Sequence, residues 1–359
     1  MTSKKTPSPD IFEILPQALA SLKKNILIPF FGFSRIPEYA SEKAPFRAEL
    51  YTEEQLALYA KTLAKNHAVV KERLAEHLLK RLAQNEDILM DVHGMLTQSV
   101  KQNHRVVPAG EWLLDNFYLI EEQVYIGKKH LPKKYSKGLP QLINGDYADY
   151  PRVYHIAVEI ISHTDGRVNL KSLVRFIKSY QTVTSLKIGE LWAIPIMLRL
   201  ALIENLRRIS IQIAMDIESK NQANYWAEEL METLEKDSKN LVLVIADMAR
   251  AKPTMDSSFV AEFTRKLQEK GTRMALPLNW LEQQLGDTSY TIAEMVHLEN
   301  QKQAADQLSI SNSISSLRFL NTNDWREFVE ETSLVEDILK KDAVYPFMDF
   351  STRDHYRHS

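Results

Sequence analysis

Apolar side chains recur at helical spacing along almost all of this 359-residue chain, and this pattern constrains the fold more than any other feature. Apolar residues at positions i, i+3, i+4 and i+7 give a helix one hydrophobic face. Only 10 glycines occur, and alternating apolar and polar residues bounded by turn signals are scarce. The sequence therefore predicts an all-α fold, an irregular stack of antiparallel helices and helical hairpins joined by short connections.

Helix boundaries follow from the same spacing and from capping residues. The Thr52 hydroxyl is the predicted N-cap of a long helix that continues through Leu78, because Glu54 and Gln55 follow in its first turn. No repeat of fixed period occurs, so a regular solenoid is not predicted. We expect an N-terminal helical segment at 1–105 and a helical core at 106–359. The other predicted helices are 11–26, 87–101, 111–125, 151–164, 169–180, 188–218, 221–236, 239–251, 257–270, 274–285, 289–308, 310–320, 324–332 and 334–341.

Composition excludes several classes of protein. The formal net charge of -2 gives no overall attraction to nucleic acid or to anionic lipid. The chain has no cysteine, which excludes disulfides, thiolate metal sites and cysteine nucleophiles. The most apolar run, Leu191 to Leu202, contains Arg199 and is shorter than the roughly 20 residues of a membrane span, so we expect a buried core helix.

The segment 108–123 is the densest in chemically active side chains. The spacing of four, three and four residues places several of them on one helical face, beside Trp112. One interpretation is an acidic stripe that binds a sugar or a metal. The alternative is a network of ion pairs with Arg152, Arg199 or Arg207, since buried carboxylates need partners. The side chains on the shared face are Glu111, Asp115, Tyr118 and Glu122.

The apolar segment 189–208 is a second candidate region and contains Trp192. Pro195 removes one helical hydrogen bond, which predicts a bend that serves packing or opens a pocket. Glu204 stands four residues before Arg208, the favourable order for an ion pair on a helix.

Three further local patterns have two interpretations each. His155, Glu159 and His163 are four residues apart and form either a metal half-site or, at His163, a cap beside Asp165. The serine-rich segment 309–316 resembles a hydroxyl-rich helix start. The lysines of the loop 127–138 either face solvent or contact phosphate groups or an acidic partner; they are Lys128, Lys129, Lys133, Lys134 and Lys137.

Several strings of this sequence resemble the N-terminal cytoplasmic region of the cyclic β-1,2-glucan synthases, large bacterial inner-membrane enzymes. They occur in the order of the family and cover roughly residues 100 to 357. The strings are Glu111–Gln123, His163–Arg167, Gly189–Arg199, Ile203–Arg208, Ser311–Arg318 and Met348–Arg357.

The resemblance implies a parent that polymerises glucose from UDP-glucose with a membrane glycosyltransferase of family 84, requires a divalent metal, and carries a phosphorylase-like region that trims the chain. The chain ends at Ser359, where the family continues, so the resemblance implies a fragment, a truncated frame or a split subunit. No DxD or QxxRW motif is present, so no catalytic or metal-binding residue is carried over and no cofactor is expected for this chain.

Three hypotheses follow. The first is a non-catalytic helical scaffold that contacts the transferase and phosphorylase modules at the cytoplasmic face of the inner membrane. Its candidate residues are Glu111, Trp112, Asp115, Tyr118, Glu122, Trp192, Arg199, Glu204 and Arg208. The second is a module that binds β-1,2-glucan, for which Trp112 or Trp192 must be exposed. The third, a glycosidase using Glu111 with Asp115 or Glu122, is disfavoured, because catalytic carboxylates flank the scissile bond from opposite sides.

Overall fold

The computed structural model describes residues 44–70, 77–102, 105–131, 138–286 and 289–358. Helices dominate these residues, which confirms the all-α class. Their one sheet is a short antiparallel pair, β1 (Val69–Val70) with β2 (Gln141–Leu142). The helix expected at 11–26 lies outside the described residues.

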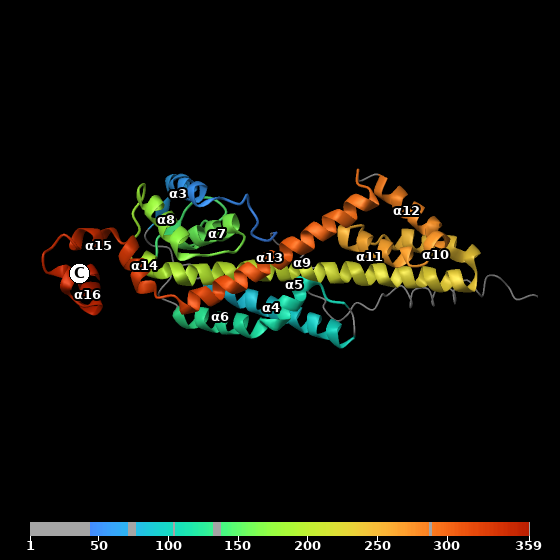
Figure 1. The fold of residues 1–359 in the computed structure, drawn as a ribbon, viewed down its shortest axis with the longest axis horizontal. Helices are drawn as coiled ribbons and strands as arrows, with labels where there is room; N and C mark the ends of the chain where they lie inside the picture. The colour runs from blue at the N-terminus through green and yellow to red at the C-terminus, as the bar shows by residue number, and fades with distance from the viewer. Residues whose placement is uncertain (1–43, 71–76, 103–104, 132–137, 287–288, 359) are drawn as a thin grey trace, which may run out of the picture.

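A single helix, α9 (Ile188–Lys236), is the axis of the molecule (Figure 1). Its 49 residues span about 74 Å at 1.5 Å per residue. It joins the two helices expected at 188–218 and 221–236, because neither glycine nor proline separates them, and it also continues through Pro195. The segment from Leu191 to Leu202 is almost wholly buried, which confirms the predicted core helix.

Six helices surround the first half of α9. Figure 1 shows α3 (Glu53–Asn66), α7 (Arg152–Thr164) and α8 (Leu170–Gln181) on one side of it. On the other side lie α4 (His77–Lys101), α5 (Pro108–Asp115) and α6 (Phe117–His130). Their apolar faces form the larger of two hydrophobic clusters, in which Leu198, Ala201 and Leu202 are fully buried.

The second half of α9 carries a smaller cluster. This half of α9 packs with α10 (Leu241–Ala251), α11 (Ser257–Gln268) and α12 (Ala275–Leu285). In the cluster, Leu230, Phe259 and Phe263 are fully buried. Short 3-10 helices, η2 (Ser238–Asn240) and η3 (Gly271–Met274), connect these elements. Helix α13 (Ile292–Thr322) then crosses back along α9 and contributes to both clusters (Figure 1).

The chain ends in a small unit beyond the start of α9 (Figure 1). It comprises α14 (Trp325–Thr332), α15 (Leu334–Leu339), η5 (Tyr345–Phe347) and α16 (Phe350–His358). No helix of the described ranges has both the length and the apolarity needed to cross a membrane.

Helix starts were predicted better than helix breaks. Thr52 is the N-cap of α3 and forms a capping box with Gln55, as predicted. The helix expected to continue through Leu78 instead ends at Asn66, because the backbone at His67 becomes extended and the chain enters β1. The helices expected at 289–308 and 310–320 are one helix, α13. The division expected at 105 stays a prediction; residues from both sides of it share the larger cluster.

Candidate functional site

The turn between α7 and α8 packs against the middle of α13. Gly166 has a φ of +77°, and a β-carbon at this position would lie 2.6 Å from Ser313 Oγ, so only glycine allows this approach. The Ser316 hydroxyl donates to the Gly166 carbonyl at 2.7 Å and accepts from the Val168 amide at 2.9 Å. The serine-rich segment 309–316 is therefore an interior face of α13, and its interpretation as a helix start is wrong.

Asn205 of α9 completes this junction and is fully buried. Its Nδ2 lies 3.3 Å from both Ser309 Oγ and Ser313 Oγ, and its Oδ1 accepts from the Phe46 amide at 2.9 Å. Strings from α7, α9 and α13 that carry the family resemblance thus meet in one buried contact, which we call the serine junction and define by Asn205, Ser309, Ser313 and Ser316 with Gly166.

Glu204, one residue before Asn205, is the centre of a cluster of arginines. Its carboxylate accepts two hydrogen bonds from Arg81, at 2.8 and 2.7 Å, and one each from Arg207 and Arg208, both at 2.8 Å. The Glu204–Arg208 pair confirms the prediction from spacing. Burial alone would raise the pKa of Glu204, but the Arg81 hydrogen bonds and the guanidinium charges outweigh it and lower the pKa far below its ordinary value.

The predicted acidic stripe lies at the surface. Trp112 is 36% exposed and Tyr118 is 64% exposed, and the carboxylates between and beyond them are also exposed. Glu111, Asp115 and Glu122 are therefore open to solvent and not enclosed in a cleft. We call this set, with Trp112 and Tyr118, the α5–α6 face.

The α5–α6 face spans two helices, whereas one helix was predicted. Asn116 interrupts it with φ -112° and ψ 12°, and its Oδ1 accepts a hydrogen bond from Arg318 of α13. Two of the three arginines suggested as partners of the stripe form ion pairs with other glutamates. Arg152 pairs with the buried Glu190 at 2.6 Å, and Arg207 pairs with Glu204.

Arg199, the third suggested partner, is buried close to this face. Its Nε donates to Gln123 Oε1 at 2.7 Å and its Nη2 donates to Asn321 Oδ1 at 3.2 Å. Burial lowers the pKa of Arg199 to about 10, and the Glu122 carboxylate opposes this shift. Arg199 thus joins α9, α6 and α13 through amide side chains, with Glu122 as a nearby charge.

A chain of hydrogen bonds links α3, α7 and α8. Tyr180 OH lies 2.7 Å from His67 Nδ1, and His67 Nε2 lies 3.0 Å from His155 Nδ1. His155 Nε2 lies 3.0 Å from Glu159 Oε1, and the Tyr59 hydroxyl donates to the other oxygen of Glu159 at 2.6 Å. His155 and Glu159 are therefore used in contacts between helices.

The second histidine of the suggested metal half-site faces the segment before α3. His163 Nδ1 lies 2.7 Å from the Glu49 carbonyl, and its ring stacks on Tyr51 with centroids 4.0 Å apart. Across the described ranges, no three histidines or carboxylates are grouped as metal ligands. Asp165, in the αL conformation, is the C-cap of α7. His163 does not cap the helix but binds the segment that precedes α3.

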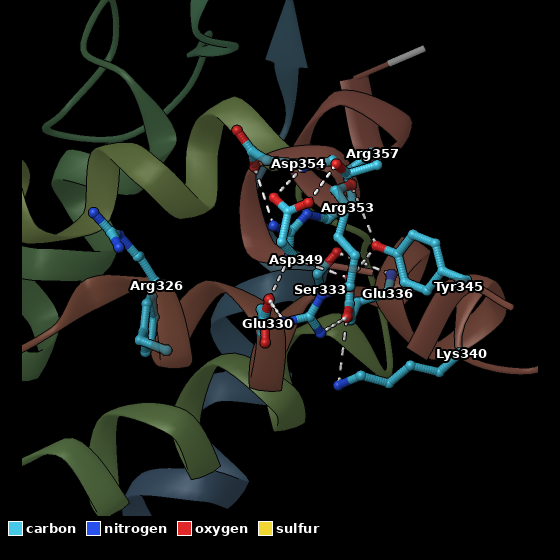
Figure 2. A network of polar contacts seen from close by, with 12 residues as sticks. Arg326, Glu330, Ser333, Glu336, Lys340, Tyr345, Asp349, Arg353, Asp354 and Arg357 are labelled. Carbon is cyan, nitrogen blue, oxygen red and sulfur yellow. Dashed lines mark hydrogen bonds and ion pairs between the residues drawn. The ribbon is translucent and has the colours of Figure 1, made fainter. Parts of the chain in front are cut away.

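Sequence reasoning missed a charged network in the C-terminal unit, which Figure 2 shows. Glu336 is completely buried and accepts hydrogen bonds from Tyr345 OH at 2.6 Å and Arg357 Nη1 at 3.1 Å. Arg353 and Arg357 also reach Glu330 of α14, at 3.0 and 3.4 Å. These arginine–glutamate pairs are 21 to 27 residues apart, so no helical spacing could have indicated them.

The same unit contacts the start of α9 through aromatic rings. Trp192 is half-buried and meets Phe350 edge to face, with centroids 6.4 Å apart. The Arg326 and Arg357 guanidinium groups lie over the same Phe350 ring, 5.3 and 4.8 Å from its centroid. Trp192 is therefore a packing residue that holds the C-terminal unit.

The basic loop is only partly described. Lys128 and Lys129 are exposed at the end of α6, where Lys128 pairs with Glu86. Lys133, Lys134 and Lys137 lie outside the described residues. A phosphate or partner contact by this loop stays a prediction.

Comparison with known proteins bears directly on the family resemblance. No family model matches the chain. The cyclic beta-(1,2)-glucan synthase NdvB of Rhizobium meliloti (strain 1021) is 29% identical over 278 residues, which are 77% of this chain. The chain spans about a tenth of the length of that relative. The resemblance read from the strings is confirmed, and over most of its length the chain is similar to part of a cyclic β-1,2-glucan synthase.

Proposed function

We propose that this chain is a non-catalytic helical scaffold of a cyclic β-1,2-glucan synthase, an enzyme that makes cyclic glucan from UDP-glucose. The observation that carries the proposal is the structural role of the strings that resemble the glucan synthases. Gly166, Asn205, Glu204 and Ser316 from these strings are committed to buried contacts between helices. Such side chains have no spare groups for acid–base or nucleophilic chemistry.

A scaffold also needs a surface for its partners, and the C-terminal unit offers one. Phe347 is 89% exposed, the highest value among the exposed large apolar side chains of the described residues, and Ile338 is 65% exposed. Exposed apolar groups that gather in one place mark protein interfaces. We propose that this surface, the apolar end face, contacts the transferase or phosphorylase module at the cytoplasmic side of the inner membrane. Its residues are Leu334, Val335, Ile338, Val344, Phe347 and Tyr356.

The absence of transfer chemistry in the purified chain is the first test. The chain is incubated with UDP-[14C]glucose, a linear β-1,2-glucan acceptor and magnesium or manganese ions, and both UDP release and labelled glucan are measured. We expect neither product. Incorporation of label by the chain alone contradicts the proposal. It would mean that this chain itself binds UDP-glucose and the divalent metal expected for the parent enzyme.

Docking is tested by binding of the purified transferase and phosphorylase modules to immobilised chain. Phe347→Ser and Ile338→Ser are expected to weaken binding at least tenfold, because the interface loses its apolar anchors. Tyr118→Ser is the matched control, since Tyr118 is similarly exposed on the distant α5–α6 face. Unchanged binding in both end-face variants rules this surface out.

A second candidate function, binding of β-1,2-glucan, is favoured by the exposure of the α5–α6 face. Trp112 and Tyr118 present aromatic surface that suits the apolar face of a pyranose ring, and Glu111, Asp115 and Glu122 can accept from sugar hydroxyls. A glucan titration that changes the NMR signals of Trp112 and Tyr118 supports this function. Signals that do not move at millimolar glucan refute it for this face.

A further inference from the structure

A broad groove lies where the two hydrophobic clusters meet. It has a volume of about 1250 Å³ and is lined by α9, α11 and α13, with further walls from α12 and the start of α5. Typical small-molecule pockets occupy about 300–1,000 Å³, so this groove has room for a ligand of several rings. No residue of the strings that resemble the glucan synthases lines the groove.

The charges that line the groove nearly balance in number, and two of its glutamates form ion pairs. Five glutamates and four basic residues line it. Glu299 accepts from Lys220 at 3.0 Å, and Glu262 accepts from Arg265 at 2.6 Å. A strongly anionic or cationic ligand would have to compete with these pairs. The groove therefore favours an uncharged ligand.

The remaining polar groups suit hydroxyl recognition. Asn221, Asn224 and Asn300 line the groove with amides, which both donate and accept, as sugar hydroxyls do. Tyr225 adds a partly exposed aromatic ring, which stands edge to face against Trp226 with centroids 5.1 Å apart. Amides around an aromatic ring are a combination that a pyranose can contact with both its polar edge and its apolar face.

Two oxygens in the groove wall lack partners within the described part of the chain. They are Asn224 Oδ1 and Thr264 Oγ1, and Thr264 is only 4% exposed. Buried polar atoms in native proteins almost always have a hydrogen-bond partner, from the protein, from water or from a ligand. Both oxygens are shielded from solvent, so a hydroxyl bound in the groove would reach them only after the side chains of Asn224 and Thr264 rotate toward it.

We propose that this groove binds a linear, uncharged β-glucan oligosaccharide along α9. The choice of glucan over other neutral saccharides rests on the proposed function, whereas the preference for an uncharged polyol rests on the groove itself. In the assembled synthase, such a site would hold a growing or released glucan chain away from the transferase.

The test is titration of the full chain with linear β-1,2-gluco-oligosaccharide, followed by saturation-transfer NMR and calorimetry. Tyr225→Ala removes the aromatic ring, and Ala293→Trp fills the groove from an exposed position on α13. Both are expected to weaken binding at least tenfold. Val242→Ala, at an exposed position of α10 outside the groove, is the control and is expected to leave the affinity unchanged. Trp112→Ala is measured beside it to test the α5–α6 face as the alternative site. Circular dichroism confirms that each variant is folded.

Each outcome decides the proposal. No binding at millimolar oligosaccharide overturns it. Binding that survives Ala293→Trp but is lost in Trp112→Ala places the ligand on the α5–α6 face and also overturns it. If a β-1,4-linked oligosaccharide binds in the groove with the same affinity as the β-1,2-linked one, the groove is a saccharide site. Its ligand then gives no support to the proposed role in a β-1,2-glucan synthase. Docking to synthase modules is measured without sugar, so the two proposals can fail independently.

Discussion

Gly166 and Ser313 approach so closely that a single added methyl group would separate α13 from the α7–α8 turn. We expect Gly166→Ala to lower the free energy of unfolding through two effects. Left-handed φ is unfavourable for alanine by about 1–2 kcal/mol, and the overlap with Ser313 Oγ adds about 1–3 kcal/mol. Urea denaturation followed by circular dichroism measures the sum.

Gly145→Ala is a matched control for this prediction. Gly145 has nearly the same φ, +75°, but a β-carbon there meets nothing within 4 Å. Its substitution therefore isolates the backbone effect. Equal losses in the two variants would contradict a steric role for the serine junction.

Replacing Glu204 is expected to be among the most damaging single substitutions in the chain. Glu204→Gln removes the carboxylate charge that accepts from Arg81, Arg207 and Arg208, and removing one partner of a buried pair costs about 3–5 kcal/mol. The measurement is the midpoint and slope of urea unfolding. Glu111→Gln, on the exposed α5–α6 face, is expected to change stability by no more than about 0.5 kcal/mol.

Stability is expected to fall as the pH is lowered from 7 to 5 because of His67. Burial, the nearby His155 and Arg152 lower the pKa of His67 to about 3 in the folded chain, against about 6.5 when unfolded. The unfolded state therefore binds more protons in this window, and folding stability is lost as pH falls. We expect a loss of about 1–2 kcal/mol from this group.

The comparison that checks this is the unfolding free energy of the natural chain and of His67→Gln at pH 7 and pH 5. The variant has no histidine proton at this position, so its dependence on pH should be shallower. Glu159 and Glu204 titrate below this window, because the pKa of each lies under its ordinary value. Parallel pH profiles for the two proteins would argue against His67.

The Glu336 network is expected to hold α16 in place. Glu336→Ala removes the acceptor of Tyr345 and Arg357, and Arg353 and Arg357 then share Glu330 as their common carboxylate. Hydrogen exchange should become faster in α16 and stay unchanged in α9. Asp337→Asn is the control, since Asp337 is the exposed neighbour of Glu336. Slow exchange in α16 of Glu336→Ala would show that Phe350 packing suffices.

Sequence patterns predicted what short-range contacts decide. The capping box of Thr52 and Gln55 and the Glu204–Arg208 pair both join residues within one turn of a helix. Periodicity also predicted the buried core of α9. Local spacing carries this information because helix geometry fixes which neighbours meet.

Features set by distant residues could not be predicted from those patterns. Arg81 reaches Glu204 from 123 positions away, and Arg318 binds Asn116 across 202 positions. Likewise, β2 determines where α3 gives way to β1, since the strand pair joins segments about 70 residues apart. The exposure of the α5–α6 face could not be predicted from the sequence either. Residue spacing shows which side chains share a helix face but not whether another element covers that face.

The continuity of α9 has a consequence for how cooperatively the protein unfolds. Both hydrophobic clusters pack on the same continuous helix, α9. Unfolding of one cluster would therefore expose part of the helix against which the other cluster packs. A single sigmoidal transition, with equal calorimetric and van 't Hoff enthalpies, is the expected signature of this coupling.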